Sequence, residues 1–191
     1  MSRNVRVLRC APEDVFEVLS DGWLYPSWVV GASRMRQVDE IWPHPGARLH
    51  HSFGVWPVLI NDKTVVEAFD PPHTMQMRAR GWPVGEALVT IHVKARGDET
   101  VVRIQEEPIA GPARLVPRPI MDAVLLWRNA ETLHRLAYLA EGRAVVRSSN
   151  TTADREQAEA PDGSGMSDSD GSDASQTQTE SRVSDQETRE S

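Results

Sequence analysis

The order of patterns along residues 3–141 predicts an α+β fold, in which a curved antiparallel sheet of about seven strands wraps around one long C-terminal helix. Three observations lead to this prediction. An N-terminal strand pattern runs directly into a short helix, several stretches of alternating apolar and polar residues follow with tight turns between them, and the last apolar pattern has the period of a helix. A curved sheet covered by a single helix rarely fills its own concave face with side chains, so we expect an apolar cavity between the two.

The N-terminal residues predict one strand followed by two short helices. Residues 4–10 alternate in the way that a strand at the edge of a sheet does. Pro12 then stands at the first position of a helix, where its missing N–H is not needed, and two acidic residues follow in the first turn, where they suit the helix dipole. Asp21 and Gly22 end this helix, and residues 23–30 predict a second, shorter helical segment.

Six further strands are predicted by a period of two in the apolar residues. Met75 and Met77, for example, alternate with Gln76 and Arg78. Each stretch is bounded by residues that favour turns, mostly Pro, Gly and Asp. The predicted strands span residues 35–42, 47–53, 58–69, 74–80, 86–95 and 100–107.

The strongest helix pattern covers residues 120–141, after a Pro-rich loop at residues 108–119. Apolar residues recur there in steps of three and four, which predicts one buried face, whereas Arg128 and Thr132 fall on the other side. Gly142 predicts the end of the helix. The residues that mark the predicted buried face are Leu126, Ala130, Leu133, Ala137 and Ala140.

Residues 143–191 differ in composition from the rest of the chain. They contain 5 Arg and 11 Asp or Glu, so about −6 of the formal net charge of −7 lies in this segment. Such a polar segment cannot bury enough apolar surface to offset the entropy of ordering, so we predict a disordered acidic tail behind a domain of residues 1–142. The tail either serves as a solubilising spacer or binds a protein partner as a docking or phosphorylated segment. The domain is nearly neutral and has no basic stripe, which argues against nucleic-acid binding.

Two further features bear on where the protein works. Cys10 is the single cysteine, so no intrachain disulfide and no metal site of paired cysteines can form, and we expect this residue to be a small buried filler. The sequence shows neither a signal-peptide pattern nor an apolar run of about 18 residues, the length that a membrane span requires. We therefore expect a cytoplasmic protein without stable membrane insertion.

Four short stretches carry a resemblance to a known family: Ala11–Phe16, Tyr25–Trp28, Pro45–Gly46 and Val65–His73. With the element order over residues 3–142, they resemble the SRPBCC superfamily, the helix-grip fold of START lipid-transfer domains, plant pollen allergens and polyketide cyclase/dehydrase-like proteins. The resemblance implies a cavity between the sheet and the C-terminal helix that holds a hydrophobic small molecule, lipid- or polyketide-like. Some members cyclise or dehydrate polyketides and others only bind or carry ligands, and no shared catalytic motif exists to transfer.

Three titratable side chains fall on the predicted inward faces of the strands: His51, Asp62 and Glu106. One interpretation is catalytic, with His51 as general acid or base and Asp62 or Glu106 as its partner, as enolisation and ring closure of a polyketide would need. The other is structural, with His51 bonded within the sheet and both carboxylates near strand ends in water. The pattern leaves both open, because a bulge of one residue would turn these side chains outward.

Aromatic and flexible side chains suggest what lines the cavity. Trp28, Trp56 and Trp82 lie near turns, where they either border the cavity mouth or anchor a loop to the body. Met77 and Met121 either give an adaptable lining or belong to an ordinary core. The full set of candidate ligand-binding residues is Trp28, His51, Phe53, Trp56, Thr64, Met77, Trp82, Glu106, Met121, Leu125 and Asn129.

No pattern points to a metal or a cofactor. The histidines match no zinc signature, and no glycine-rich phosphate loop or nucleophile elbow is present, so we expect no metal and no cofactor. Three hypotheses for the function remain. The first is binding of a hydrophobic or aromatic small molecule, the second a polyketide cyclase or dehydratase that uses a cavity His–carboxylate pair, and the third a protein-interaction module of the co-chaperone or toxin type.

Overall fold

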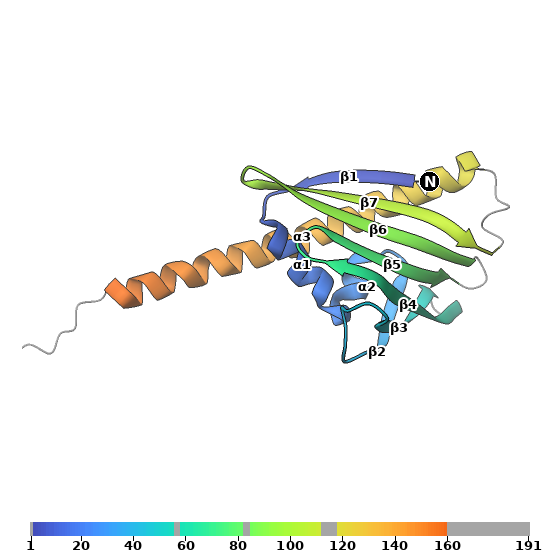
Figure 1. Cartoon of the computed structure of the whole chain (residues 1–191), viewed down its shortest axis with the longest axis horizontal. Helices are drawn as coiled ribbons and strands as arrows, with labels where there is room; N and C mark the ends of the chain where they lie inside the picture. The colour runs from blue at the N-terminus through green and yellow to red at the C-terminus, as the bar shows by residue number, and fades with distance from the viewer. Residues whose placement is uncertain (1, 56–57, 82–84, 112–117, 160–191) are drawn as a thin grey trace, which may run out of the picture.

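A computed structural model describes residues 2–55, 58–81, 85–111 and 118–159. It confirms the predicted α+β helix-grip architecture, with a seven-stranded sheet, short helices after the first strand and one long C-terminal helix that packs against the sheet (Figure 1). The elements are β1 (Ser2–Leu8), α1 (Pro12–Ser20), the 3₁₀ turn η1 (Gly22–Leu24), α2 (Tyr25–Trp28), β2 (Ala32–Val38), β3 (Arg48–Val55), β4 (Val58–Asp70), β5 (Thr74–Gly81), β6 (Gly85–Arg96), β7 (Glu99–Ala110) and α3 (Arg118–Glu159).

The seven strands form one antiparallel sheet in the order β1-β7-β6-β5-β4-β3-β2. Strands β2 to β7 follow one another as a meander, and β1 pairs with β7 at the opposite edge. The register between β4 and β5 shifts between Val66 and Ala68, and two further shifts occur between β2 and β3. Bulges of this kind bend a strand and increase its twist, which helps the sheet to wrap toward α3.

Two strands, β2 and β7, differ from their predicted bounds by three residues or more. β2 ends at Val38 rather than at residue 42, because the Asp39 carboxylate accepts a hydrogen bond from the Arg48 amide at 3.0 Å and closes a loop there. β7 continues to Ala110 through Pro108, which was predicted to begin a loop. The register shifts opposite Pro108, and a bulge is one of the few places in a sheet where proline is tolerated.

Helix α1 begins where its sequence predicts. Pro12 occupies the first position, and the Asp14 carboxylate accepts a hydrogen bond from the Ala11 amide at 2.9 Å. Its apolar side packs into a single core between the sheet and the helices, together with residues of α3 such as Leu133 and Leu136. The buried side chains that α1 contributes are Val15, Phe16, Val18 and Leu19.

The buried face of α3 was predicted incorrectly at its N-terminal end. Leu126 is 43% exposed and Ala130 is exposed, whereas Thr132, which was predicted on the outer side, is buried. This part of α3 faces a cavity that accepts polar side chains, and the candidates Leu125 and Asn129 are buried there. Farther along, Leu133, Ala137 and Ala140 are buried as predicted.

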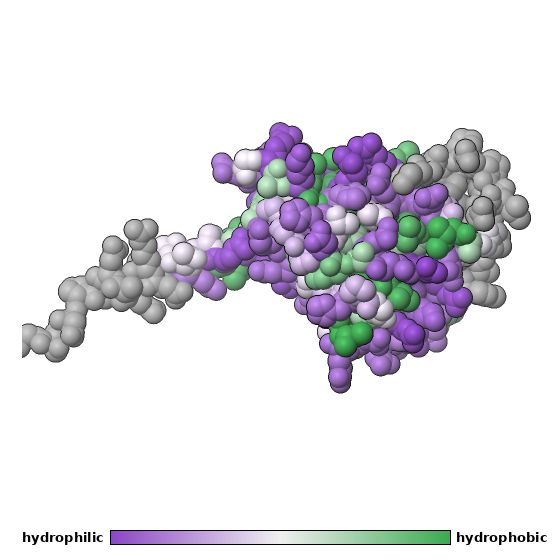
Figure 2. All heavy atoms as spheres, in the orientation of Figure 1, coloured by the Kyte–Doolittle hydropathy of each residue, from purple (hydrophilic) through white to green (hydrophobic). Residues whose placement is uncertain are grey.

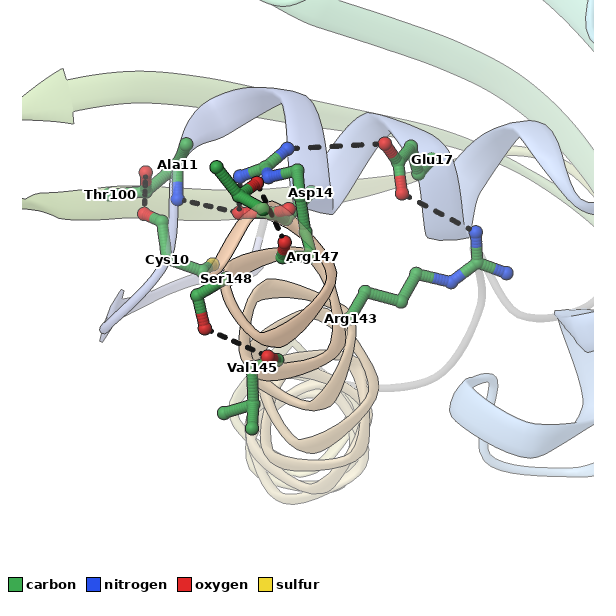
Figure 3. A network of polar contacts seen from close by, with 10 residues as sticks. Cys10, Ala11, Asp14, Glu17, Thr100, Arg143, Val145, Arg147 and Ser148 are labelled. Carbon is green, nitrogen blue, oxygen red and sulfur yellow. Dashed lines mark hydrogen bonds and ion pairs between the residues drawn. The ribbon is translucent and has the colours of Figure 1, made fainter. Parts of the chain in front are cut away.

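The predicted end of α3 at Gly142 was also wrong, because the helix continues to Glu159 and projects beyond the sheet (Figure 1). Residues 143–159 are therefore helical rather than a disordered tail, whereas residues 160–191 lie outside the described part of the chain. Arg147 Nη2 lies 2.7 Å from Asp14 Oδ2, and Arg143 Nη2 lies 3.5 Å from Asp21 Oδ2. Figure 3 shows Arg143 and Arg147 reaching from α3 to the acidic side of α1, and these contacts stabilise the continuation of the helix.

Cys10 lies beside this network (Figure 3) and is buried, as its sequence context predicts. Burial raises the pKa of its thiol to about 12, with smaller contributions from the nearby Asp14 and Glu141 carboxylates. The thiol therefore stays protonated at neutral pH and acts as a core side chain rather than a nucleophile.

The surface is mostly polar on the face drawn in Figure 2, where hydrophobic residues occur in separate small groups. No helix in the described part of the chain is both long and apolar enough to cross a membrane.

Candidate ligand-binding cavity

A cavity of about 170 Å³ lies between the inner face of the sheet and the N-terminal half of α3. Its walls come from α2, strands β2, β3, β5, β6 and β7, and α3, so segments far apart in the sequence meet there. Aromatic side chains of Tyr25, Trp28 and Phe53 form one part of the lining. Aliphatic side chains form most of the rest, among them Val29, Met77, Val89, Ile104 and Leu125.

A polar cluster is built around Tyr25 at one side of this cavity. Thr64 Oγ1 lies 3.1 Å from the Tyr25 hydroxyl oxygen and 3.0 Å from His51 Nε2, so the threonine bridges the two rings. The ring centroids of Tyr25 and His51 are 5.2 Å apart, and those of Tyr25 and Trp28 are 5.4 Å apart. The three rings therefore form one group, with Tyr25 in the middle.

Burial controls the charge of this cluster. Desolvation lowers the pKa of His51 below its ordinary value of 6.5, although the nearby Asp62 carboxylate opposes the shift. Desolvation likewise raises the pKa of Tyr25, although its hydrogen bond with Thr64 opposes the shift. Both rings are consequently uncharged at neutral pH.

A buried ion pair joins the sheet to α3 at the cavity wall. Arg128 Nη2 donates to Glu106 Oε1 at 2.8 Å and to Glu106 Oε2 at 2.6 Å. The Glu106 side chain is only 5% exposed, whereas that of Arg128 is 25% exposed. The guanidinium thus neutralises a carboxylate that would be costly to bury alone.

Three polar atoms of cavity-lining residues have no hydrogen-bond partner among the described residues. They are the indole Nε1 of Trp28, Nδ1 of His51 and Nε of Arg128. A buried N–H without an acceptor is uncommon in folded proteins, because its desolvation is not repaid. These three atoms are themselves buried, although other atoms of the same side chains line the cavity.

The comparison with known families agrees with this architecture. A family model described as polyketide cyclase / dehydrase and lipid transport matches residues 2–141. The chain belongs to this family. The assignment confirms the resemblance to the SRPBCC superfamily, and it supports a ligand-binding fold without naming the ligand or an activity.

Solved structures share the fold at low sequence identity. The di-domain ARO/CYC protein StfQ from the steffimycin biosynthetic pathway has a TM-score of 0.60 at 13% identity, over 74% of this chain and 50% of that one. Protein CV1439 from Chromobacterium violaceum has a TM-score of 0.54 at 20% identity, over 73% and 96% of the two chains. Ara h 8.0201 has a TM-score of 0.55 at 13% identity, over 75% and 96%. A search of the curated proteins found no significant match.

Most of the ligand-binding candidates in this family member can now be placed. Thr64 is buried behind the lining, where it contacts His51 and Tyr25. Trp56 and Trp82 lie outside the described residues, as does the side chain of Met121. The candidates that line the cavity are Trp28, His51, Phe53, Met77, Glu106, Leu125 and Asn129.

The three catalytic candidates do not meet in one group. His51 and Asp62 are direct cross-strand neighbours on β3 and β4, and both are buried. Glu106 lies on β7, with β6, β5 and β4 between it and the strand of His51, and its carboxylate is bonded to Arg128. The arrangement therefore retains a His51–Asp62 pair, in which the carboxylate acts on the imidazole through its charge, and assigns Glu106 a different partner.

Among the lining residues that sequence reasoning missed are two that organise the polar groups of the site, Tyr25 and Arg128. Tyr25 was interpreted only as part of a fold signature, and Arg128 was placed on the outward side of its helix. The signal for Arg128 was available, because a glutamate predicted to be buried needs a cation, and the arginine lies on the helix that covers the sheet. For Tyr25 the sequence held no comparable signal, since its contacts with Thr64 and His51 join α2 to β3 and β4.

Proposed function

We propose that the domain binds a hydrophobic or aromatic small molecule, lipid- or polyketide-like, in the cavity between the sheet and α3. The observation that supports this most directly is the lining itself, in which aromatic and aliphatic side chains surround a small number of polar groups. Small-molecule sites in proteins have this composition, because apolar surface supplies binding energy and a few polar atoms fix the orientation.

The cavity volume limits what can enter without rearrangement. An engineered apolar cavity of about 150 Å³ in another protein binds benzene. The cavity here, at about 170 Å³, therefore suits a molecule of one or two rings. A larger ligand would require the walls to move apart.

The test is a titration of the full chain with indane, a two-ring hydrocarbon, followed by two-dimensional NMR. Indane should shift the signals of lining residues such as Met77. Val89→Phe places a larger side chain in the cavity, so it should weaken indane binding by about tenfold or more. Leu88→Phe is the matched control, because Val89 lines the cavity and the side chain before it on a strand points to the opposite face of the sheet.

Unchanged affinity in Val89→Phe would mean that indane binds elsewhere and would contradict the proposal. Native mass spectrometry of the purified chain provides a second measurement, in which a retained small molecule would identify a natural ligand.

A second function, catalysis of the polyketide cyclase or dehydratase type, is favoured by one observation. His51 is buried, has a pKa lowered by desolvation, and keeps Nδ1 without a partner among the described residues. A neutral imidazole of this kind can accept a proton from carbon next to a ligand carbonyl. The test is exchange of the C2 hydrogens of 1-indanone in D₂O. Acceleration by the protein that disappears in His51→Phe supports catalysis, whereas exchange at the buffer rate supports binding alone.

A further inference from the structure

We propose that the outer side of α3 binds a second copy of this chain, with the two helices antiparallel across a two-fold axis. This surface lies on the side of α3 that faces away from the cavity, so the proposal does not depend on the ligand. Its residues follow one another in steps of three, four or seven, and such a series stays on one side of a helix. They form what we call the outer line of α3: Val124, Trp127, Glu131, His134, Tyr138 and Val145.

Large apolar side chains on the outer line are exposed. Trp127 is 70% exposed, Tyr138 is 79% exposed and Val145 is 64% exposed. The buried side chains of the same helix, such as Leu133 and Leu136, lie on its other side, so the outer line faces away from the core. A single exposed apolar residue is ordinary, but several large ones along one line of one helix are typical of an interaction surface.

The two aromatic residues define a register for a pair of such helices. If Trp127 packs against Tyr138 of the second copy, the two-fold axis also brings Tyr138 against Trp127 of the second copy. One contact therefore occurs twice, at the two ends of the shared surface. Pairs of aromatic rings bury a large area for few ordered torsions, and aromatic residues are enriched in protein interfaces.

The same register matches the charges between the two aromatic pairs. Four residues beyond Trp127 lies Glu131, and four residues before Tyr138 lies His134, so Glu131 meets His134 of the second copy. Arg135 Nε of the same chain contacts Glu131 Oε1 at 2.8 Å, and Oε2 can accept a hydrogen bond from the second copy. A parallel pair would place Glu131 against Glu131, where like charges repel each other, so the charges favour the antiparallel arrangement.

The spacing of the outer line suits two helices in lengthwise contact. Alternating steps of three and four residues average 3.5, the period at which two helices stay together by winding around each other with a left-handed twist. Polar residues in the middle of such a contact reduce its affinity but fix the orientation of the partners. The contact involves one helix from each copy and is small, so we expect a Kd in the micromolar range.

Sedimentation velocity of the full chain over a series of micromolar concentrations tests the proposal. The measured mass should rise from that of one chain to that of two. Trp127→Ala and Tyr138→Ala should each raise the Kd of the dimer by about thirtyfold or more, because each removes an aromatic contact at both ends. Trp23→Ala is the matched control, because Trp23 is also well exposed, at 61%, but lies on η1 rather than on α3, and this variant should keep the Kd of the natural chain.

A mixture of two charge variants tests the antiparallel register. Glu131→Lys and His134→Glu each lose the matched pair, so each variant alone should have a Kd about tenfold higher than the natural chain. In a mixed dimer, the introduced lysine of one copy meets the introduced glutamate of the other, and the remaining Glu131 and His134 keep their natural contact. The mixture should therefore associate with a Kd close to that of the natural chain.

Four results would overturn the proposal. The first is a full chain that keeps the mass of one chain at every concentration. The second is a dimer that persists unchanged in both aromatic variants, because another face must then form the contact. The third is a mixture that associates no better than the separate charge variants, which would refute the antiparallel pairing. The fourth is dimerisation only after the chain is shortened to end at residue 159, which would make residues 160–191 the occupant of the outer line.

Discussion

The buried ion pair between Glu106 and Arg128 offers a sharp test of what holds α3 on the sheet. Arg128→Met removes the cation but keeps the apolar stem of the side chain. Breaking a fully buried pair costs about 3–5 kcal/mol, because the remaining charge is left without compensation. The Glu106 side chain is 5% exposed but that of Arg128 is 25% exposed, so water reaches one side of the pair. We therefore expect the free energy of unfolding to fall by about 2–3 kcal/mol.

Urea unfolding at pH 7 measures this loss, and thermal unfolding should show a Tm lower by roughly 6–12 °C for a domain of this size. Arg135→Met is the control on the same helix. Arg135 also pairs with a glutamate, Glu131, at 2.8 Å, but both side chains are well exposed, at 43% and 38%. Water screens an exposed pair of this kind, so Arg135→Met should change the free energy of unfolding far less than Arg128→Met.

A second variant separates charge from packing. Glu106→Gln combined with Arg128→Met removes both charges, and it should recover part of the stability lost in Arg128→Met alone, because no uncompensated carboxylate remains. The reasoning is refuted if Arg128→Met lowers the free energy of unfolding no more than Arg135→Met does. It is also refuted if the double variant is less stable than Arg128→Met alone.

Two further predictions follow from the burial of His51 and the length of α3. Because burial lowers the pKa of His51 below 6.5, the unfolded chain binds a proton that the folded chain does not, and the free energy of unfolding should fall as the pH drops below about 6.5. Between pH 7.5 and pH 5.5, urea unfolding should show a smaller loss in the free energy of unfolding for His51→Phe than for His50→Phe. Equal losses would contradict the lowered pKa of His51. A chain that ends at residue 142 loses the ion pair of Arg147 with the buried Asp14, which an otherwise similar chain ending at residue 159 keeps. The shorter chain should be less stable by about 1 kcal/mol, since Arg147 is itself half exposed, and equal melting temperatures would show that this part of α3 does not dock.

Much of the candidate site could be predicted because strands repeat every two residues. His51 and Glu106 are buried because they stand in step with apolar neighbours, and that alternation is visible in the sequence. Their hydrogen-bond partners could not be predicted in the same way. Tyr25, Thr64 and Arg128 come from three different elements, and only the packing of those elements brings them to the cavity.

The sequence by itself determined the order of the elements, the fold class and the inward faces of most strands, because turns and local periodicity are properties of neighbouring residues. The tertiary structure alone decided how α3 is rotated about its axis and where it ends. Leu126 is exposed and Thr132 buried because the cavity accepts a polar side chain. Gly142 does not end the helix because α1 offers acidic partners to the arginines beyond it. Both outcomes depend on what the helix packs against, and that surface is built from residues distant in the chain.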